Sequence, residues 1–169
     1  MTPGAGAPAY DAIIIGAGIS GMYQLHRLRE LGLRVRVFEA GDGVGGTWYW
    51  NRYPGARFDS ESWTYGYSFS DEILREWEWS EHFAPQPETL RYCNFVAYKL
   101  DLRRDIEFNC RVSSAAFDEG ANEWEITTAH GERARARFLI TAIGPLSAPT
   151  MPTIPGVGDF RGEAYHTGR

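Results

Sequence analysis

Three glycines near the start of the chain have the spacing of a turn that binds the diphosphate of a dinucleotide. Gly16, Gly18 and Gly21 stand in the order GxGxxG, and Glu39 follows 18 residues after the last of them. The first glycine of such a turn permits the tight bend, the second lets backbone amides approach a pyrophosphate, and the third lets a helix pack against a strand. An acid at the place of Glu39 accepts hydrogen bonds from ribose hydroxyls and repels a 2′-phosphate. The spacing therefore predicts a site for FAD or NAD rather than NADP.

The elements that must position these residues follow from the apolar pattern. Residues 12–15 form an apolar run before the glycines, residues 19–31 carry apolar residues at helical spacing, and residues 35–38 form a second apolar run. This order predicts a strand, a helix and a second strand, which together make a βαβ unit. The amino end of the helix has unpaired N–H groups and a positive dipole end, so we expect it to face the phosphates.

A long irregular passage, residues 41–59, follows the second strand. Loops of this length without regular structure are uncommon in compact domains unless they have a function. The passage interleaves glycines with aromatic residues, among them Trp48, Tyr49 and Trp50. Glycine permits close approach of the backbone, whereas the aromatic rings need to be buried by something else. We expect a bound ring system to bury them.

The remaining segments predict an α/β fold in which a parallel sheet contains an inserted antiparallel β-meander. Short and longer helices are expected over 70–77 and 89–102, and a third strand over 106–112. Residues 145–155 contain four prolines and predict an extended connector. The meander is expected at 114–117, 124–128 and 134 onward. An apolar strand that returns to the parallel sheet is expected at 138–144.

Composition and charge exclude several classes of function. The chain has 169 residues, enough for one domain with a core, and it carries a net charge of −5. A nucleic-acid partner would require a basic face, and no apolar run is long enough to span a membrane. Cys93 and Cys110 lack the spacing of a metal or redox site. We therefore expect buried thiols, no metal and a cytoplasmic location.

Four stretches of the sequence resemble one known family. They are Gly16–Gly21, Gly45–Arg57 together with Asp59, Glu61 and Ser62, Thr141–Ser147, and Phe160–His166. The second stretch, GGTWYWNRYPGAR, and the fourth, FRGEAYH, are the specific ones. The fourth is similar to the fingerprint FxGxxxHxxxW, whose last residue would fall at position 170. With these motifs the chain resembles the N-terminal FAD-binding part of the Baeyer-Villiger monooxygenases.

The resemblance implies a flavin enzyme that uses NADPH and O₂ to convert ketones to esters or lactones. In this family NADPH reduces FAD, and a flavin C4a-peroxide then attacks the ketone carbonyl. An arginine from an NADPH-binding domain, absent from this chain, keeps the peroxide anion unprotonated. The implied partners of the intact enzyme are a small-molecule ketone and O₂, with no nucleic acid and no membrane. We expect the 169-residue fragment alone to be inactive.

The resemblance also implies roles for individual residues. Asp59 would pair with the arginine of the missing domain. Arg57 would meet a nucleotide phosphate or pair with Asp59 or Glu61, and these two residues, Asp59 and Arg57, are the catalytic candidates. Phe58 stands where the family more often has cysteine, which suggests larger cyclic ketones as substrates. Within the FAD site, Glu39 would hold the ribose, residues 47–50 would follow the flavin half and Val112 would contact the adenine. The full set expected to bind FAD is Gly16, Gly18, Ser20, Gly21, Glu39, Gly46, Thr47, Trp48, Tyr49, Trp50, Asp59, Tyr65 and Val112.

This interpretation divides the chain into three regions and leaves alternatives open. Residues 1–9 are expected to be a flexible leader, 10–144 the N-terminal part of a Rossmann-like FAD-binding domain, and 145–169 a connector toward a missing NADPH-binding domain. The alternatives are a non-catalytic FAD-binding module, a flavin N-hydroxylating monooxygenase and an NAD-dependent dehydrogenase domain. The dehydrogenase leaves residues 45–59 unexplained, and the N-hydroxylating enzyme does not account for residues 57–62.

Overall fold

A mixed sheet of six strands forms the centre of the molecule. The structure is a computed structural model and describes residues 9–168. The strands are β1 (Ala9–Ile15), β2 (Val35–Phe38), β3 (Ile106–Glu107), β4 (Val112–Asp118), β5 (Glu123–Thr128) and β6 (Arg133–Thr141). They lie in the order β3-β2-β1-β6-β5-β4, parallel from β3 to β6 and antiparallel from β6 to β4. This arrangement confirms the predicted α/β fold with an antiparallel meander.

The predicted βαβ unit is present at the amino end of the chain. Helix α1 (Ile19–Glu30) connects β1 to β2, and the two strands pair in parallel from Ala12 with Val35 to Ile15 with Phe38. Met22 and Leu25 on α1 are fully buried against the sheet. Strand β1 begins at Ala9, before the apolar run that predicted it. The leader expected at 1–9 is therefore wrong at Ala9, and its residues 1–8 lie outside the described residues.

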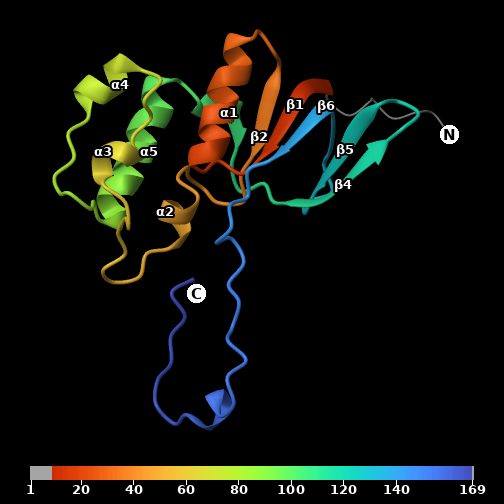
Figure 1. Cartoon of the computed structure of the whole chain (residues 1–169). Coiled ribbons are helices and arrows are strands. Elements are labelled where there is room, and N and C mark those ends of the chain that lie inside the picture. Colours follow the sequence, from red (N-terminus) through yellow and green to blue (C-terminus); the bar gives the residue numbers. More distant parts are fainter. Residues whose placement is uncertain (1–8, 169) are drawn as a thin grey trace.

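Strand β6 differs from the prediction, which divided its residues between the meander and a separate returning strand. In the structure, one continuous strand belongs to both the meander and the parallel sheet. Its residue Ala136 pairs in parallel with Tyr10 of β1 and antiparallel with Trp124 of β5. The segment contains no glycine, proline or other turn residue that would interrupt an extended backbone. The inserted meander therefore continues the same sheet as the parallel strands (Figure 1).

The third predicted strand is much shorter than expected. The prediction covered residues 106–112, but β3 ends at Glu107 and the next strand begins at Val112. Asn109 has a φ of 55°, a left-handed conformation that asparagine tolerates better than most residues and that turns the chain out of the sheet. The turn directs the residues after it from the parallel half of the sheet to the meander.

Short helices and one longer helix cover one flank of the sheet. They are α2 (Thr47–Trp50), α3 (Ser62–Tyr65), α4 (Asp71–Glu76) and α5 (Gln86–Lys99). The Oγ of Ser70 accepts a hydrogen bond from the amide of Ile73, which confirms the predicted cap of α4. Helix α5 begins at Gln86 rather than Thr89, because Pro85 and Pro87 suit the first turn of a helix. Figure 1 shows α3 and α4 gathered around α5, on the side of α1 away from the meander.

The core divides into layers on the two faces of the sheet. Apolar residues of β1 and β2 pack against α1 and α5 on one face, and Ile13 packs with Ile126 and Ala134 of the meander on the other. A third cluster lies between α4 and α5 around Tyr92. Among the helices within residues 9–168, none is long and apolar enough to cross a membrane.

The last part of the chain leaves the sheet after β6. Residues 142–168 contain no strand and one short 3-10 turn, η2 (Val157–Asp159). The connector predicted for 145–155 has no regular element, but it turns and bends at 145–148. Figure 1 shows this segment running away from the body and folding back toward it. Several of its apolar side chains are exposed, including Leu146, Ile154 and Phe160.

Candidate functional site

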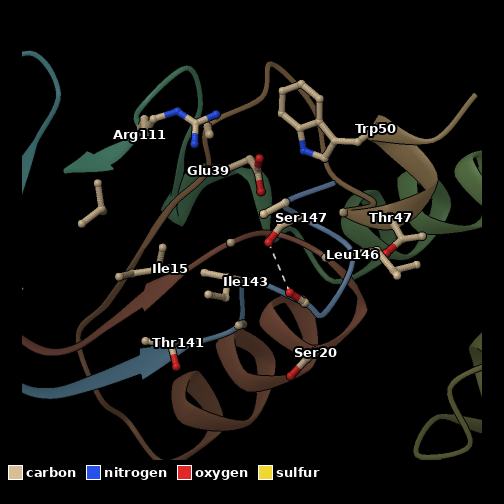
Figure 2. A pocket seen from close by; sticks show the side chains of 18 of the residues that line it. Ile15, Ser20, Glu39, Thr47, Trp50, Arg111, Thr141, Ile143, Leu146 and Ser147 are labelled. Carbon is tan, nitrogen blue, oxygen red and sulfur yellow. Dashed lines mark hydrogen bonds between the residues drawn. The ribbon is translucent and has the colours of Figure 1, made fainter. Parts of the chain in front are cut away.

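A pocket of about 630 Å³ lies at the carboxyl ends of the central parallel strands. The chain leaves β1 toward β2 on one side, while β6 lies on the other side, so the pocket occupies the point where the strand order reverses. We call it the strand-end pocket (Figure 2). It is lined by Ile15, Gly16, Gly18, Ser20, Phe38, Glu39, Ala40, Gly46, Thr47, Trp50, Asn51, Cys110, Arg111, Val112, Thr141, Ala142, Ile143, Gly144, Leu146, Ser147, Ala148 and Gly168.

Two glycines of the GxGxxG motif are required by close backbone contacts. Gly16 has a φ of 101°, and a Cβ added there would lie 2.6 Å from the carbonyl oxygen of Ala142. A Cβ on Gly21 would lie 1.9 Å from the carbonyl oxygen of Gly16, so the first turn of α1 packs directly on the strand end. These contacts are the tight bend and the close helix packing that the spacing predicts. Gly21 therefore supports the pocket from behind and does not line it.

The middle glycine brings two loops together at the amino end of α1. A Cβ on Gly46 would lie 2.8 Å from the Cα of Gly18, and the amide of Gly45 donates a hydrogen bond to the carbonyl of Ala17 at 3.0 Å. The glycine-rich segment after β2 thus packs on the first glycine loop. No side chain caps the amino end of α1, whose first amides remain available to a ligand. Such an uncapped end next to side-chain-free backbone suits an anionic diphosphate.

Glu39 directly follows β2 and is the buried acid of the pocket. Its side chain is 4% exposed, and its two carboxylate oxygens accept hydrogen bonds from the amides of Ala17 and Gly41 at 2.7 Å and 2.8 Å. These bonds tie the first glycine loop to the segment that follows β2. A carboxylate has acceptor sites for about four hydrogen bonds, so two such bonds leave capacity for ligand hydroxyls. Figure 2 shows the carboxylate among the side chains that line the pocket.

The predicted FAD-binding residues fall into two groups in the structure. Eight of them line the strand-end pocket: Gly16, Gly18, Ser20, Glu39, Gly46, Thr47, Trp50 and Val112. The other five, namely Gly21, Trp48, Tyr49, Asp59 and Tyr65, are not among the lining residues. The two groups alternate around α2, since Thr47 and Trp50 face the pocket and the residues between them do not.

Trp48 and Tyr65 pack together behind the pocket. The Nε1 of Trp48 donates a hydrogen bond to the hydroxyl of Tyr65 at 2.6 Å, and both rings pack on Phe58. Burial is the main cause that raises the pKa of Tyr65. Tyr49 has a different role, because its hydroxyl donates to Asp42 at 2.5 Å and its ring occupies the space that a Cβ on Gly41 would need. These aromatic residues hold the loop on which the pocket depends.

The two candidate catalytic residues lie apart from the strand-end pocket. Arg57 pairs with Glu81 at 2.9 Å and donates to the carbonyl of Phe83 at 3.1 Å. Asp59 is exposed. Phe58 lies between them in sequence but points into the core, where it is 4% exposed. The arrangement places one cation and one anion on the surface beside a buried aromatic ring.

Several lining residues were not assigned as ligands from the sequence. Thr141, Ile143 and Ser147 line the pocket, although the motif at 141–147 by itself predicts no binding role for them. The signal that identifies them is topological: β1 and β6 are parallel neighbours, so their carboxyl ends meet at one edge of the sheet. Arg111, which precedes Val112, was also missed. Nothing in its local sequence separates it from an ordinary surface arginine.

Cys110 is the buried thiol of the pocket wall. It is 3% exposed, and burial together with Glu107 and Glu132 raises its pKa to about 12. The potential ligand atoms of these three residues lie within 4.8 Å of one another.

Comparisons with known proteins support the same interpretation. Residues 14–74 match the model of the NAD(P)-binding Rossmann-like domain. The chain is 53% identical over 159 residues to an acetone monooxygenase (methyl acetate-forming) of Gordonia sp. strain TY-5, which covers 94% of the chain and 30% of that relative. It is 47% identical to a Baeyer-Villiger monooxygenase of Pseudooceanicola batsensis, over 94% of the chain and 29% of the relative. A phenazine N-monooxygenase of Lysobacter antibioticus is 49% identical, over 94% of the chain and 30% of that protein.

Solved structures agree with the sequence comparisons. The crystal structure of OTEMO in complex with FAD and NADP has a TM-score of 0.86 and 51% identity to the chain, and the match covers 97% of the chain and 31% of that structure. The chain thus spans about 30% of the length of the relatives that it matches. By sequence and by fold, almost the whole chain matches one part, about 30%, of monooxygenases of the Baeyer-Villiger type.

Proposed function

We propose that the strand-end pocket binds FAD and that the chain is the FAD-binding part of a flavin monooxygenase. The observation that carries this proposal is the convergence in one pocket of the uncapped end of α1, the glycine contact at Gly18 and the acid Glu39. These groups provide amides for a diphosphate and acceptors for ribose hydroxyls. The OTEMO structure, at 51% identity, contains FAD and NADP and supports the choice of cofactor.

The proposed reaction of the whole protein is the NADPH- and O₂-dependent conversion of a ketone to an ester or lactone. Bound FAD would supply the oxygen chemistry, for which no amino-acid side chain is suited. The residues of this chain would hold the adenosine diphosphate half in the strand-end pocket and exclude water with the aromatic residues of α2. The acetone monooxygenase relative, whose name includes methyl acetate formation, supports a ketone as the substrate.

We also propose how the remaining predicted residues contribute. Residues 10–144 would form the FAD-binding unit, and 145–169 would lead to the part that binds NADPH. Asp59 is exposed and would pair with an arginine of that part, while Arg57 would turn from Glu81 to a nucleotide phosphate. These roles require groups beyond the chain, so they are tested in the longer protein.

A second candidate function is N-oxidation of an aromatic heterocycle. It is supported by the phenazine N-monooxygenase, which is as similar to this chain as the ketone-oxidising relatives are. The chain's own residues would bind FAD in the same way in both cases. Comparing a ketone with a phenazine as substrate of the longer protein separates the two, because only the true substrate gives an oxygenated product.

Flavin binding by the 169-residue chain is the direct test of the proposed site. We expect the chain to bind FAD with quenching of flavin fluorescence and to bind FMN, which lacks the adenosine half, much more weakly. Ser20→Glu places a carboxylate at the exposed amino end of α1, where it would repel the diphosphate without disturbing the core. It should weaken FAD binding at least tenfold, whereas the control Thr150→Glu, in the connector, should not. Equal binding by both variants would contradict the proposed site.

A further inference from the structure

Arg111 is the single lysine or arginine among the described residues that line the strand-end pocket, and Glu39 is the single acid. Its side chain is exposed and forms no hydrogen bond or ion pair with any residue in 9–168. Most other arginines near a cavity of this chain are already paired, as Arg34 is with Asp11 and Arg29 with Asp105. The guanidinium of Arg111 is therefore available to a ligand in the pocket.

The backbone of Arg111 is held firmly although its side chain is free. Its carbonyl accepts a hydrogen bond from the amide of Ala129 at 2.7 Å, and the amide of Cys110 donates to the carbonyl of Glu39 at 2.8 Å. Val112, the next residue, pairs with Thr128 at the start of β4. The guanidinium thus projects from a fixed position on the same side of the pocket as the end of β2.

Arg111, Trp50 and Glu39 all line the strand-end pocket. In the view of Figure 2, the carboxylate of Glu39 lies between the guanidinium of Arg111 and the indole of Trp50. Trp50 is 52% exposed, a large value for an indole that lines a cavity. A planar cation, an exposed aromatic ring and a ribose-binding acid together form an environment for a purine nucleoside.

We propose that Arg111 binds the adenine of the dinucleotide by stacking its guanidinium on the purine ring, an inference that rests on the proposed FAD site. The diphosphate has its own site at Gly18 and the amino end of α1, on the other side of Glu39, so Arg111 acts on the base rather than on the phosphates. Arg111 is then a determinant of affinity for every ligand that contains adenosine and for none that lacks it.

The test measures binding of ADP, FAD and FMN to the 169-residue chain by calorimetry. Arg111→Ala should weaken ADP and FAD binding by the same factor, roughly fivefold, because stacking of a cation on an aromatic ring has this magnitude. FMN binding should not change. The matched control is Arg91→Ala, which removes an exposed arginine from α5, away from the pocket, and should leave all three affinities within twofold.

Arg111→Lys separates stacking from simple charge attraction. Lysine keeps the charge and loses the planar guanidinium, so stacking predicts affinities close to those of Arg111→Ala. Wild-type affinity in Arg111→Lys, or an unchanged affinity for ADP in Arg111→Ala, would overturn the proposal. If the wild-type chain bound FAD no more tightly than ADP, the FAD site would be contradicted. The effect of Arg111→Ala on the affinity for ADP would still decide the role of Arg111.

Discussion

At the residue scale, the glycines of the first motif serve different purposes that the sequence could predict. Gly16 bends the chain, Gly18 lies against the backbone of Gly46, and Gly21 lets the first turn of α1 pack on the end of the strand. These roles follow from backbone geometry that is common to dinucleotide-binding units, so spacing alone identifies them. Substitutions at these positions should therefore have separable effects on stability and binding.

Replacing Gly21 with alanine should destabilise the whole chain. A methyl group at this position would lie 1.9 Å from the carbonyl oxygen of Gly16, which is backbone and cannot rotate away. Forcing the helix off the strand is expected to cost about 3 kcal/mol of the free energy of unfolding. Urea unfolding monitored by circular dichroism measures this cost. Gly158→Ala is the control, since nothing lies within 4 Å of its added Cβ, and an equal stability of the two variants would argue against the packing described.

Alkaline pH should destabilise the fold through buried thiols and a buried phenol. Burial raises the pKa of Cys93, Cys110 and Tyr92 to about 12 in each case, above the ordinary values of 9.0 for a thiol and 10.0 for a phenol. A group with a raised pKa in the folded state contributes stability that is complete below its unfolded pKa and is lost as the pH rises toward the folded value. Stability should therefore decrease from about pH 9 upward.

The measurement for this prediction is the urea midpoint at pH 7.5 and at pH 10.5. The difference between the two midpoints should be smaller in Cys93→Ala, because one of the buried titrating groups is then absent. Each protein is compared with itself at the two pH values. The stability that Cys93→Ala loses because of its new cavity therefore cancels. A midpoint that does not fall between the two pH values would contradict the assignment.

The orientation of the aromatic residues could not be predicted from the sequence. Thr47 and Trp50 line the pocket, whereas Trp48 and Tyr49 do not, although all four lie in one four-residue helix. Their orientations depend on distant partners, such as Tyr65 for Trp48 and the glycines at 41 and 43 for Tyr49. Long-range packing of this kind leaves no periodic signal in a short segment.

At the scale of elements, periodicity located the main helices and strands but not how the strands share the sheet. The extent of β1 and of β6, and the early end of β3, depend on pairing with strands far away in sequence and on a left-handed Asn109. Tertiary pairing of this kind overrides local propensity. The prediction therefore succeeded for the βαβ unit, which is local, and was wrong for the boundary between parallel strands and meander.

The segment before α5 is held by one buried acid. Glu88 is 3% exposed, and its carboxylate accepts hydrogen bonds from the amide and the hydroxyl of Ser80 at 2.8 Å and 2.6 Å. Glu88→Ala should cost about 2 kcal/mol, because it leaves these two donors without their partner. Thermal unfolding compared with Glu78→Ala, which removes an exposed acid, measures the cost. Equal melting temperatures would show that the bonds contribute little.

At the scale of the whole molecule, one pocket among residues 9–168 has the features of a dinucleotide site. The chain spans about 30% of the length of its relatives. We expect it to bind FAD without oxidising a ketone, because the groups proposed to bind NADPH lie outside it. The measurement is NADPH consumption and ester formation by the purified chain with FAD and a ketone, with a full-length relative as the positive control. Ester formation above the rate of free FAD would contradict this expectation.

The continuity of β6 has a practical consequence for protein engineering. Because one strand is both the last strand of the meander and the neighbour of β1, no crossover point exists between the two halves of the sheet. A chimera that exchanges the meander between relatives would have to carry β4, β5 and all of β6 as one block. Such a block also includes Arg111's neighbour Val112 and the start of the pocket wall at Thr141, so grafting for stability would alter ligand recognition at the same time.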